Sequence, residues 1–257
     1  MNELIFEEKG PVAIITLNRP DKRNAMNSSV VKHLTDLLIY INNSQHIASA
    51  IITGKGKAFI AGADIKEYSQ QSPHEFALYQ QRGRAMYELI ENNEKTIITA
   101  VNGMAFGGGF ELVLASDLVI ADKTAKMGLP EIKLGLIPGG GGIHKLSRLI
   151  GNKRAKEYLL TGKHFNAEKA EELGIVNKVV DSTGLYSETF RIAEEISAAA
   201  PLAARKVKHL VNEGLKVSAD TAFSLEQEAL SELYQTRDAE EGIQAFVAKR
   251  SARFQGK

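Results

Sequence analysis

Residues 102–112 read NGMAFGGGFEL, and three consecutive glycines, Gly107 to Gly109, open a helix that the pattern predicts to end at Ala115. The first backbone N–H groups of a helix have no partner within it and lie at the positive end of its dipole. Without side chains at these positions, an anion or a developing oxyanion can approach the N–H groups closely. Tight packing of the helix against a strand would favour the same glycines, so both explanations stay open.

Strands and helices alternate on both sides of this segment. Compact runs of β-branched residues predict strands, and runs with a period of 3.6 predict helices. Asn27-Ser28-Ser29 supplies N-cap candidates for one helix, and Ser72 with Glu75 has the spacing of a capping box for another. The strands are predicted at residues 12–17, 48–53, 96–101, 118–121 and 176–180. Such alternation is typical of an α/β architecture.

The chain changes character beyond Ser182, where the segments have helical periodicity with breaks near Pro201 and Gly214. We therefore divide it into an α/β core at residues 1–199, which contains the substrate site, and a helical region at residues 200–257. Short helices cannot bury their apolar faces alone. This region is expected to pack on the core, on a partner subunit, or on both.

Composition excludes several kinds of partner and site. The 257 residues include 32 Lys and Arg against 31 Asp and Glu, so the formal net charge of +1 gives no long-range field for nucleic acid or an acidic membrane. We expect neither partner. The absence of cysteine excludes disulfides, thiolate metal sites and a cysteine nucleophile. The first residues lack the pattern of a signal peptide, and no run has the length of a membrane span, so we expect a cytoplasmic protein.

Several common chemistries have no motif in this chain. Neither glycine run begins a dinucleotide-binding G-x-G-x-x-G, and no phosphate-binding G-x-x-x-x-G-K-[ST] occurs. The six histidines have no metal-ligand spacing, and H-E-x-x-H and G-x-S-x-G are absent. We therefore expect neither a metal site nor serine-hydrolase chemistry.

Two glutamates remain as candidates for acid–base chemistry. Glu111 is about one turn inside the helix that the glycines open, among apolar neighbours, where burial would raise its pKa. Glu131 follows a proline and precedes a second glycine run at residues 139–142. Each also has an ordinary structural explanation: Glu111 as a solvent-facing residue near a helix N-terminus, and Glu131 as a first-turn residue after proline.

Residues 58–67, AFIAGADIKE, and the segment 102–142 resemble the enoyl-CoA hydratase (crotonase) family. The paired motifs A-G-A-D-I and G-G-G-x-E-L at this separation are specific, and the resemblance extends over nearly the whole chain. It implies an α/β fold built as a spiral of ββα units, rather than an open doubly wound sheet. It also implies a helical C-terminal region that forms homotrimers, which often pair into hexamers.

The resemblance further implies roles for individual residues. The backbone N–H groups of Ala63 and Gly108 would hold the thioester carbonyl, because an enolate-like oxyanion needs two fixed donors. Glu131 would deliver a proton to Cα, while Glu111 would position and activate the water that attacks Cβ. The expected reaction is hydration of a 2-enoyl-CoA to a 3-hydroxyacyl-CoA, as in fatty-acid β-oxidation. CoA is then part of the substrate, and no cofactor is implied.

Recognition of CoA is less sharply encoded. By resemblance, Lys22 or Arg23 lies near the CoA phosphates and Lys249 reaches a phosphate, although each could be an ordinary surface charge. The residues implied to line the adenine and pantetheine path are Ala61, Asp64 and Ile65.

Departures from the family pattern leave the acyl chain undetermined. Ile143-His144 stands where many hydratases have Thr-Gln, and Phe110 is bulkier than the residue often found there. The alternatives are a specialised member such as a methylglutaconyl-CoA hydratase, an enoyl-CoA isomerase and, more remotely, a non-catalytic CoA- or RNA-binding scaffold. The pair of glutamates favours a hydratase, since family isomerases generally lack one of them. The near-neutral charge argues against RNA.

Overall fold

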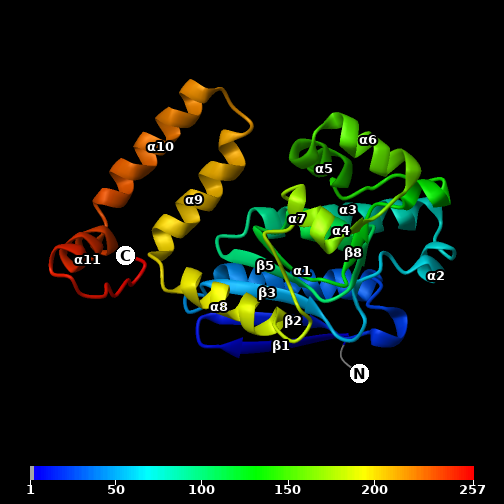
Figure 1. Cartoon of the computed structure of the whole chain (residues 1–257), viewed down its shortest axis with the longest axis horizontal. Coiled ribbons are helices and arrows are strands. Elements are labelled where there is room, and N and C mark those ends of the chain that lie inside the picture. The colour runs from blue at the N-terminus through cyan, green and yellow to red at the C-terminus, as the bar shows by residue number, and fades with distance from the viewer. Residues whose placement is uncertain (1–2) are drawn as a thin grey trace.

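The computed structural model describes residues 3–257, and within them the chain winds through two β-sheets (Figure 1). The larger sheet has the strand order β1-β2-β3-β5-β7-β10. β1 and β2 are antiparallel, and the other neighbouring pairs are parallel. The strands are β1 (Leu4–Lys9), β2 (Val12–Leu17), β3 (Ser49–Gly54), β5 (Thr96–Val101), β7 (Leu118–Asp122) and β10 (Lys178–Val180).

A smaller sheet has the strand order β4-β6-β8-β9. Its strands are β4 (Ala58–Ile60), β6 (Met104–Phe106), β8 (Lys126–Gly128) and β9 (Phe165–Asn166). β4, β6 and β8 come shortly after β3, β5 and β7 respectively, so the chain visits the large sheet, then the small sheet, and then helical structure. The spiral of ββα units expected from the resemblance is confirmed.

Helices cover both faces of the larger sheet. The strand β2 shows why, because its alternate side chains belong to two separate apolar clusters. Val12 and Ile14 pack with residues of α8 (Leu185–Ser197), whereas Ala13 and Ile15 join the main core. That core also contains the inner faces of α1 (Ser28–Asn43) and α3 (Pro73–Glu91). The predicted N-cap at Asn27 and the capping box at Ser72 are both confirmed.

Short helices between the strands position the site. The helix predicted from Gly107 begins at Gly108, because Gly107 is its N-cap. The short elements are η1 (Pro20–Lys22), α2 (Ile65–Tyr68), α4 (Gly108–Ala115), η2 (Glu131–Leu134), α5 (Gly142–Ile150), α6 (Asn152–Thr161) and α7 (Ala167–Glu172).

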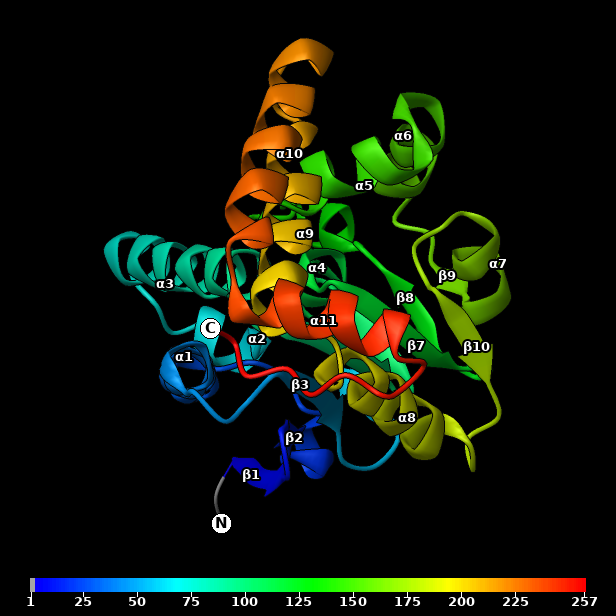
Figure 2. The ribbon, with the colours of Figure 1, turned by 90° about the vertical axis from the view of Figure 1, so that its left-hand side faces the viewer.

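The chain continues into α9 (Pro201–Gly214), α10 (Ala219–Tyr234) and α11 (Arg237–Val247). α9 and α10 lie side by side and extend away from the sheets (Figure 1 and Figure 2). Many apolar side chains of these helices are exposed, including Val207, Val211, Phe223, Leu230, Tyr234, Ile243, Phe246 and Val247. Within residues 3–257, no helix is long and apolar enough to cross a membrane.

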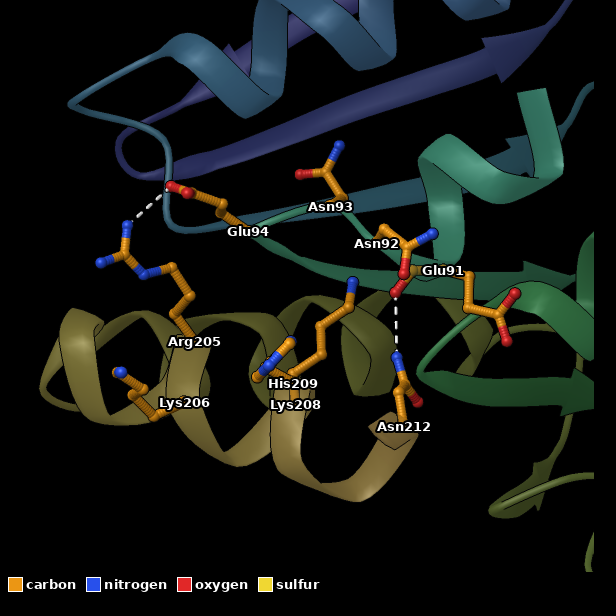
Figure 3. A pocket seen from close by; sticks show the side chains of 9 residues that line it. All are labelled: Glu91, Asn92, Asn93, Glu94, Arg205, Lys206, Lys208, His209 and Asn212. Carbon is orange, nitrogen blue, oxygen red and sulfur yellow. Dashed lines mark hydrogen bonds and ion pairs between the residues drawn. The ribbon is translucent and has the colours of Figure 1, made fainter. Parts of the chain in front are cut away.

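A polar contact holds α9 against the core. The Lys208 ammonium donates to the Asp117 carboxylate at 2.8 Å and to two backbone carbonyls, so its three protons are satisfied. Arg205 forms an ion pair with Glu94, and both line a pocket between α9 and the core that is surrounded by polar side chains (Figure 3). These contacts fix the orientation of α9 relative to the sheet.

Candidate active site

A cavity of about 380 Å³ lies where the chain leaves β4 and β6 and meets α3, α4 and η2. Its walls are mainly apolar and aromatic, and they include two carboxylates, Glu111 and Glu131. A concave apolar site with a few polar groups is typical of proteins that bind a small organic ligand.

The segment after β4 directs one backbone donor into this cavity. Met26 pairs with Ala63 in a short parallel bridge: the Met26 N–H donates to the Gly62 carbonyl at 2.9 Å, and its carbonyl accepts from the Asp64 N–H at 2.8 Å. Because successive N–H groups of an extended chain point in opposite directions, the Ala63 N–H points away from Met26. It donates to no other group within residues 3–257.

The glycine run at the start of α4 supplies a second donor. Gly107 has a φ of +52°, a conformation that side chains rarely adopt. The Gly108 N–H follows it in the first turn and donates to no group among residues 3–257. A Cβ added to Gly108 would lie 2.6 Å from Met26 Cε, and one added to Gly109 would lie 2.7 Å from Ile60 Cβ. Both explanations of the glycines therefore hold. Gly107 and Gly108 leave a backbone N–H accessible to a ligand, and Gly109 allows the helix to pack closely on β4.

Glu111 lies in the first turn of α4 and is only 5 % exposed. Its Oε1 accepts hydrogen bonds from the N–H groups of Gly140 at 2.7 Å and Gly142 at 3.0 Å. Burial raises the pKa of Glu111, whereas these two donors and the Lys145 ammonium favour its charged form. The solvent-facing alternative is wrong, because the side chain points into the protein and one of its oxygens is fixed.

Glu131 occupies a different environment at the start of η2. Its Oε2 is buried and accepts no hydrogen bond from the part of the chain that the structure describes. Burial raises the pKa of Glu131 to about 7, and the nearby charge of Glu111 adds to the rise. Of the two carboxyl groups, Glu111 therefore ionises first, and its charge helps to keep the proton on Glu131.

The structure separates the other predicted site residues into groups. Ala61 and Ile65 line the cavity beside Ala63, whereas the Asp64 carboxylate is 3.1 Å from the Arg19 guanidinium and does not line the cavity wall. Lys22 and Arg23 are exposed at the surface, and the Arg23 carbonyl accepts from the Ala61 N–H at 3.1 Å. They are therefore adjacent to the segment that enters the site.

Lys249 lies apart from this group. It is exposed and follows α11, at the opposite end of the molecule from α2 (Figure 1). Lys249 is not among the described residues that line the cavity.

Sequence reasoning missed two parts of the site. One is an aromatic wall from α2 and α3, which consists of Tyr68, Phe76, Tyr79 and Tyr87. By their helical spacing alone, Phe76 and Tyr79 would be ordinary inner-face residues of a helix. The other is the pair of N–H donors at Gly140 and Gly142; the glycine run itself was a signal, but its partner is some 30 residues earlier in the chain. Among residues 3–257, no three His, Asp or Glu side chains gather to hold a metal ion.

Comparison with known proteins agrees with this arrangement. A family model for enoyl-CoA hydratase/isomerase matches residues 7–257. The short-chain-enoyl-CoA hydratase of Clostridium acetobutylicum is 38 % identical over 97 % of this chain and 96 % of its own. The crotonyl-CoA hydratase of Syntrophomonas wolfei is 40 % identical over 98 % and 97 % of the two chains. A crystal structure of an enoyl-CoA hydratase from Bacillus anthracis covers 100 % of both chains with a TM-score of 0.97 and 36 % identity.

Proposed function

Because the chain belongs to the enoyl-CoA hydratase/isomerase family, we propose that it is an enoyl-CoA hydratase, which adds water across the α,β double bond of a 2-enoyl-CoA. The product is a 3-hydroxyacyl-CoA, and fatty-acid β-oxidation is the proposed setting. One observation carries the proposal: a single cavity contains one carboxylate held by two backbone N–H groups and a second whose buried Oε2 has no hydrogen-bond partner in the described part of the chain. Hydration needs a base and an acid, and these environments provide them.

The backbone donors act on the thioester. With its carbonyl oxygen between the N–H groups of Ala63 and Gly108, the thioester is polarised and Cβ becomes electrophilic. As water adds to Cβ, negative charge moves to the same oxygen, where two fixed donors stabilise it more strongly than they stabilise the ground state. The dipole of α4 adds to this effect at Gly108.

The two glutamates then move the protons. The Glu111 carboxylate accepts a proton from the water as its oxygen bonds to Cβ, and Oε2 is available for this because Oε1 is already held. The protonated Glu131 gives its proton to Cα, which completes the hydration. Exchange of protons with solvent restores the starting state of the pair.

The second half of the proposal concerns assembly and CoA. We propose that residues 1–199 form the catalytic core and that residues 200–257 join subunits into a homotrimer or a hexamer of two trimers. Leu230 is exposed while Leu225 and Leu233 are half-buried, and a partner subunit would cover such apolar surface. Native mass spectrometry tests this, and a stable monomer or dimer at micromolar concentration would contradict it.

For CoA, we propose phosphate contacts from Lys22 or Arg23 and from Lys249. Because Lys249 is distant from the cavity of its own chain, it would reach CoA only across a subunit interface. Ala61, Asp64 and Ile65 would flank the pantetheine and adenine, with Asp64 acting through its position beside Arg19. A cytoplasmic location is likewise proposed.

A panel of thioesters tests the activity directly. Loss of the conjugated-thioester absorbance is followed with short, long, branched and carboxylated 2-enoyl-CoAs, and with 3-enoyl-CoAs for isomerisation. We expect hydration of at least one 2-enoyl-CoA, and a branched carboxylated preference would indicate the specialised hydratase. Isomerisation without hydration would contradict the proposal in favour of an isomerase, and binding without turnover would favour a scaffold.

A further inference from the structure

Helix α3 carries two buried tyrosines that reach the two backbone segments with the donors of the oxyanion hole. The Tyr87 hydroxyl donates to the Gly108 carbonyl at 2.9 Å. The Tyr79 hydroxyl donates to the Met26 carbonyl at 3.1 Å. The side chains are 5 % and 7 % exposed, and eight residues correspond to little more than two helical turns. One rigid helix therefore contacts both sides of the hole.

The Tyr87 hydroxyl lies in the space that a side chain at position 108 would occupy. A Cβ added to Gly108 would lie 2.8 Å from Tyr87 Oη and 2.6 Å from Met26 Cε, so these two atoms fill the space that a side chain would occupy. Because glycine is conformationally free, neighbouring groups must hold it in place. The hydroxyl holds the Gly108 carbonyl, and Met26 packs against its Cα.

Tyr79 holds the segment of the other donor, Ala63, through its hydrogen bond to Met26. The Met26 carbonyl accepts from both the Tyr79 hydroxyl and the Asp64 N–H, while the Met26 N–H donates to the Gly62 carbonyl. These bonds flank Ala63 and determine the direction of its N–H. Met26 thus pairs with Ala63 through its main chain and packs against Gly108 through its side chain.

We infer that Tyr79 and Tyr87 are positioning residues. They set the distance between the two backbone N–H groups, of Ala63 and Gly108, that would bind the oxyanion. The inference rests on the proposed function, because it assumes that a thioester carbonyl lies between these two N–H groups. Neither hydroxyl proton is free for the ligand, since each is already donated to a main-chain carbonyl. Burial also raises the pKa of both hydroxyls, so they remain protonated donors at any working pH.

Removing each hydroxyl while keeping the ring tests the inference. In Tyr87→Phe we expect kcat to fall about tenfold with KM within about twofold, because a small misplacement of a donor weakens transition-state binding more than substrate binding. Tyr79→Phe acts one residue further away, and we expect a fall of roughly threefold. Thr189→Val is the control, because Thr189 on α8 is also a fully buried hydroxyl that donates to a backbone carbonyl, at 2.7 Å. It should lower the melting temperature similarly and leave kcat unchanged.

A spectroscopic readout distinguishes positioning from general stability. Butyryl-CoA labelled with carbon-13 at the thioester carbonyl is saturated and cannot be hydrated, so its infrared C=O frequency reports polarisation in the hole. We expect bound ligand to absorb at lower frequency than free ligand in the wild type, and the Tyr87→Phe and Tyr79→Phe variants to lose part of that shift. If the wild type lowers the frequency and both variants retain the whole shift, the inference is wrong while the proposed function stands. If the wild type itself gives no shift, the oxyanion hole and the inference built on it both fail.

Discussion

Glu111 and Glu131 are chemically identical groups in one cavity, yet their surroundings differ in almost every respect. Glu111 lies on the buried helix α4, and its Oε1 accepts hydrogen bonds from two backbone N–H groups. Glu131 begins a short 3-10 turn followed by exposed apolar residues, and its Oε2 has no partner among residues 3–257. Fixed backbone dipoles, rather than residue type, distinguish the two carboxyl groups, and in the proposed mechanism this difference makes Glu111 the base and Glu131 the acid.

Replacing either carboxyl by an amide should have the largest effect. Glu111→Gln and Glu131→Gln keep the size of the side chain and delete the ionisable group, so each should reduce hydration by at least roughly 10²-fold. Binding of a CoA thioester should change little in either variant. Stopped-flow absorbance with a 2-enoyl-CoA and a titration with butyryl-CoA measure the two quantities.

The double variant is the internal control for this prediction. Because both groups serve one water and one substrate, the combined loss should be far less than the product of the single losses. Full hydratase activity in Glu111→Gln would show that one carboxyl suffices, and a single-acid reaction such as isomerisation would replace the two-glutamate account.

Moving Glu111 without removing it should have a smaller effect. A Cβ on Gly142 would lie 3.0 Å from both Glu111 Cγ and Oε1. Gly142→Ala should therefore displace the Glu111 side chain without contacting Glu131. We expect kcat to fall about tenfold with an unchanged alkaline limb of the pH profile. Gly184→Ala, at the N-cap of α8 with only a 3.5 Å contact to a backbone oxygen, is the matched control. Equal losses in both variants would contradict a role for the Gly142 contact.

The pH profile should report Glu131. Its pKa of about 7 means that the acid form is lost as pH rises through neutrality, so hydration should fall roughly fivefold between pH 7 and pH 8. The residual rate of Glu131→Gln should lack this decline. A wild-type rate that stays constant to pH 9 would contradict the assignment of Glu131 as the acid.

Much of the fold around the site could be predicted from short-range sequence patterns, whereas the contacts that hold the site in place could not. The strands at residues 12–17 and 96–101, the caps at Asn27 and Ser72, and the glycine-opened helix follow from short-range patterns, and the structure confirms them. The small sheet was not predicted, because strands of two or three residues are too short to show a period of two. β1 was missed as well, because its three apolar residues are followed by three charged ones and do not alternate in polarity.

The contacts that tune the site join distant parts of the chain. Gly140 and Gly142 reach Glu111 only because α5 packs beside α4, and Tyr87 reaches Gly108 across 21 residues. No local pattern encodes such a contact, since each partner has an ordinary local explanation. The motif resemblance likewise indicates Glu131 as the acid, but only the fold shows that its Oε2 is buried and has no partner among the residues that the structure describes.

The smallest expected effect is on stability. The folded-state pKa of Glu131 is raised above its ordinary value, so the proton contributes stability that is present below about pH 4.5 and is lost as pH rises through about 7. The amide in Glu131→Gln does not ionise, so the variant does not lose this stability as the pH rises. The melting temperature of the variant minus that of the wild type should therefore increase by a few degrees between pH 5 and pH 8. Glu172→Gln, at an exposed position, should show no such trend, and a parallel trend in both would contradict the explanation.

Exchange of the Cα protons of butyryl-CoA in D₂O tests the division of labour most directly. The Glu131 carboxylate would take a Cα proton, exchange it with solvent and return a deuteron, while the oxyanion hole holds the enolate and no water attacks Cβ. Proton NMR follows the exchange in both single variants. Glu131→Gln should suppress exchange by at least roughly 10²-fold, whereas Glu111→Gln should keep it within about tenfold of wild type. Loss of exchange in Glu111→Gln with retention in Glu131→Gln would reverse the roles and contradict the account.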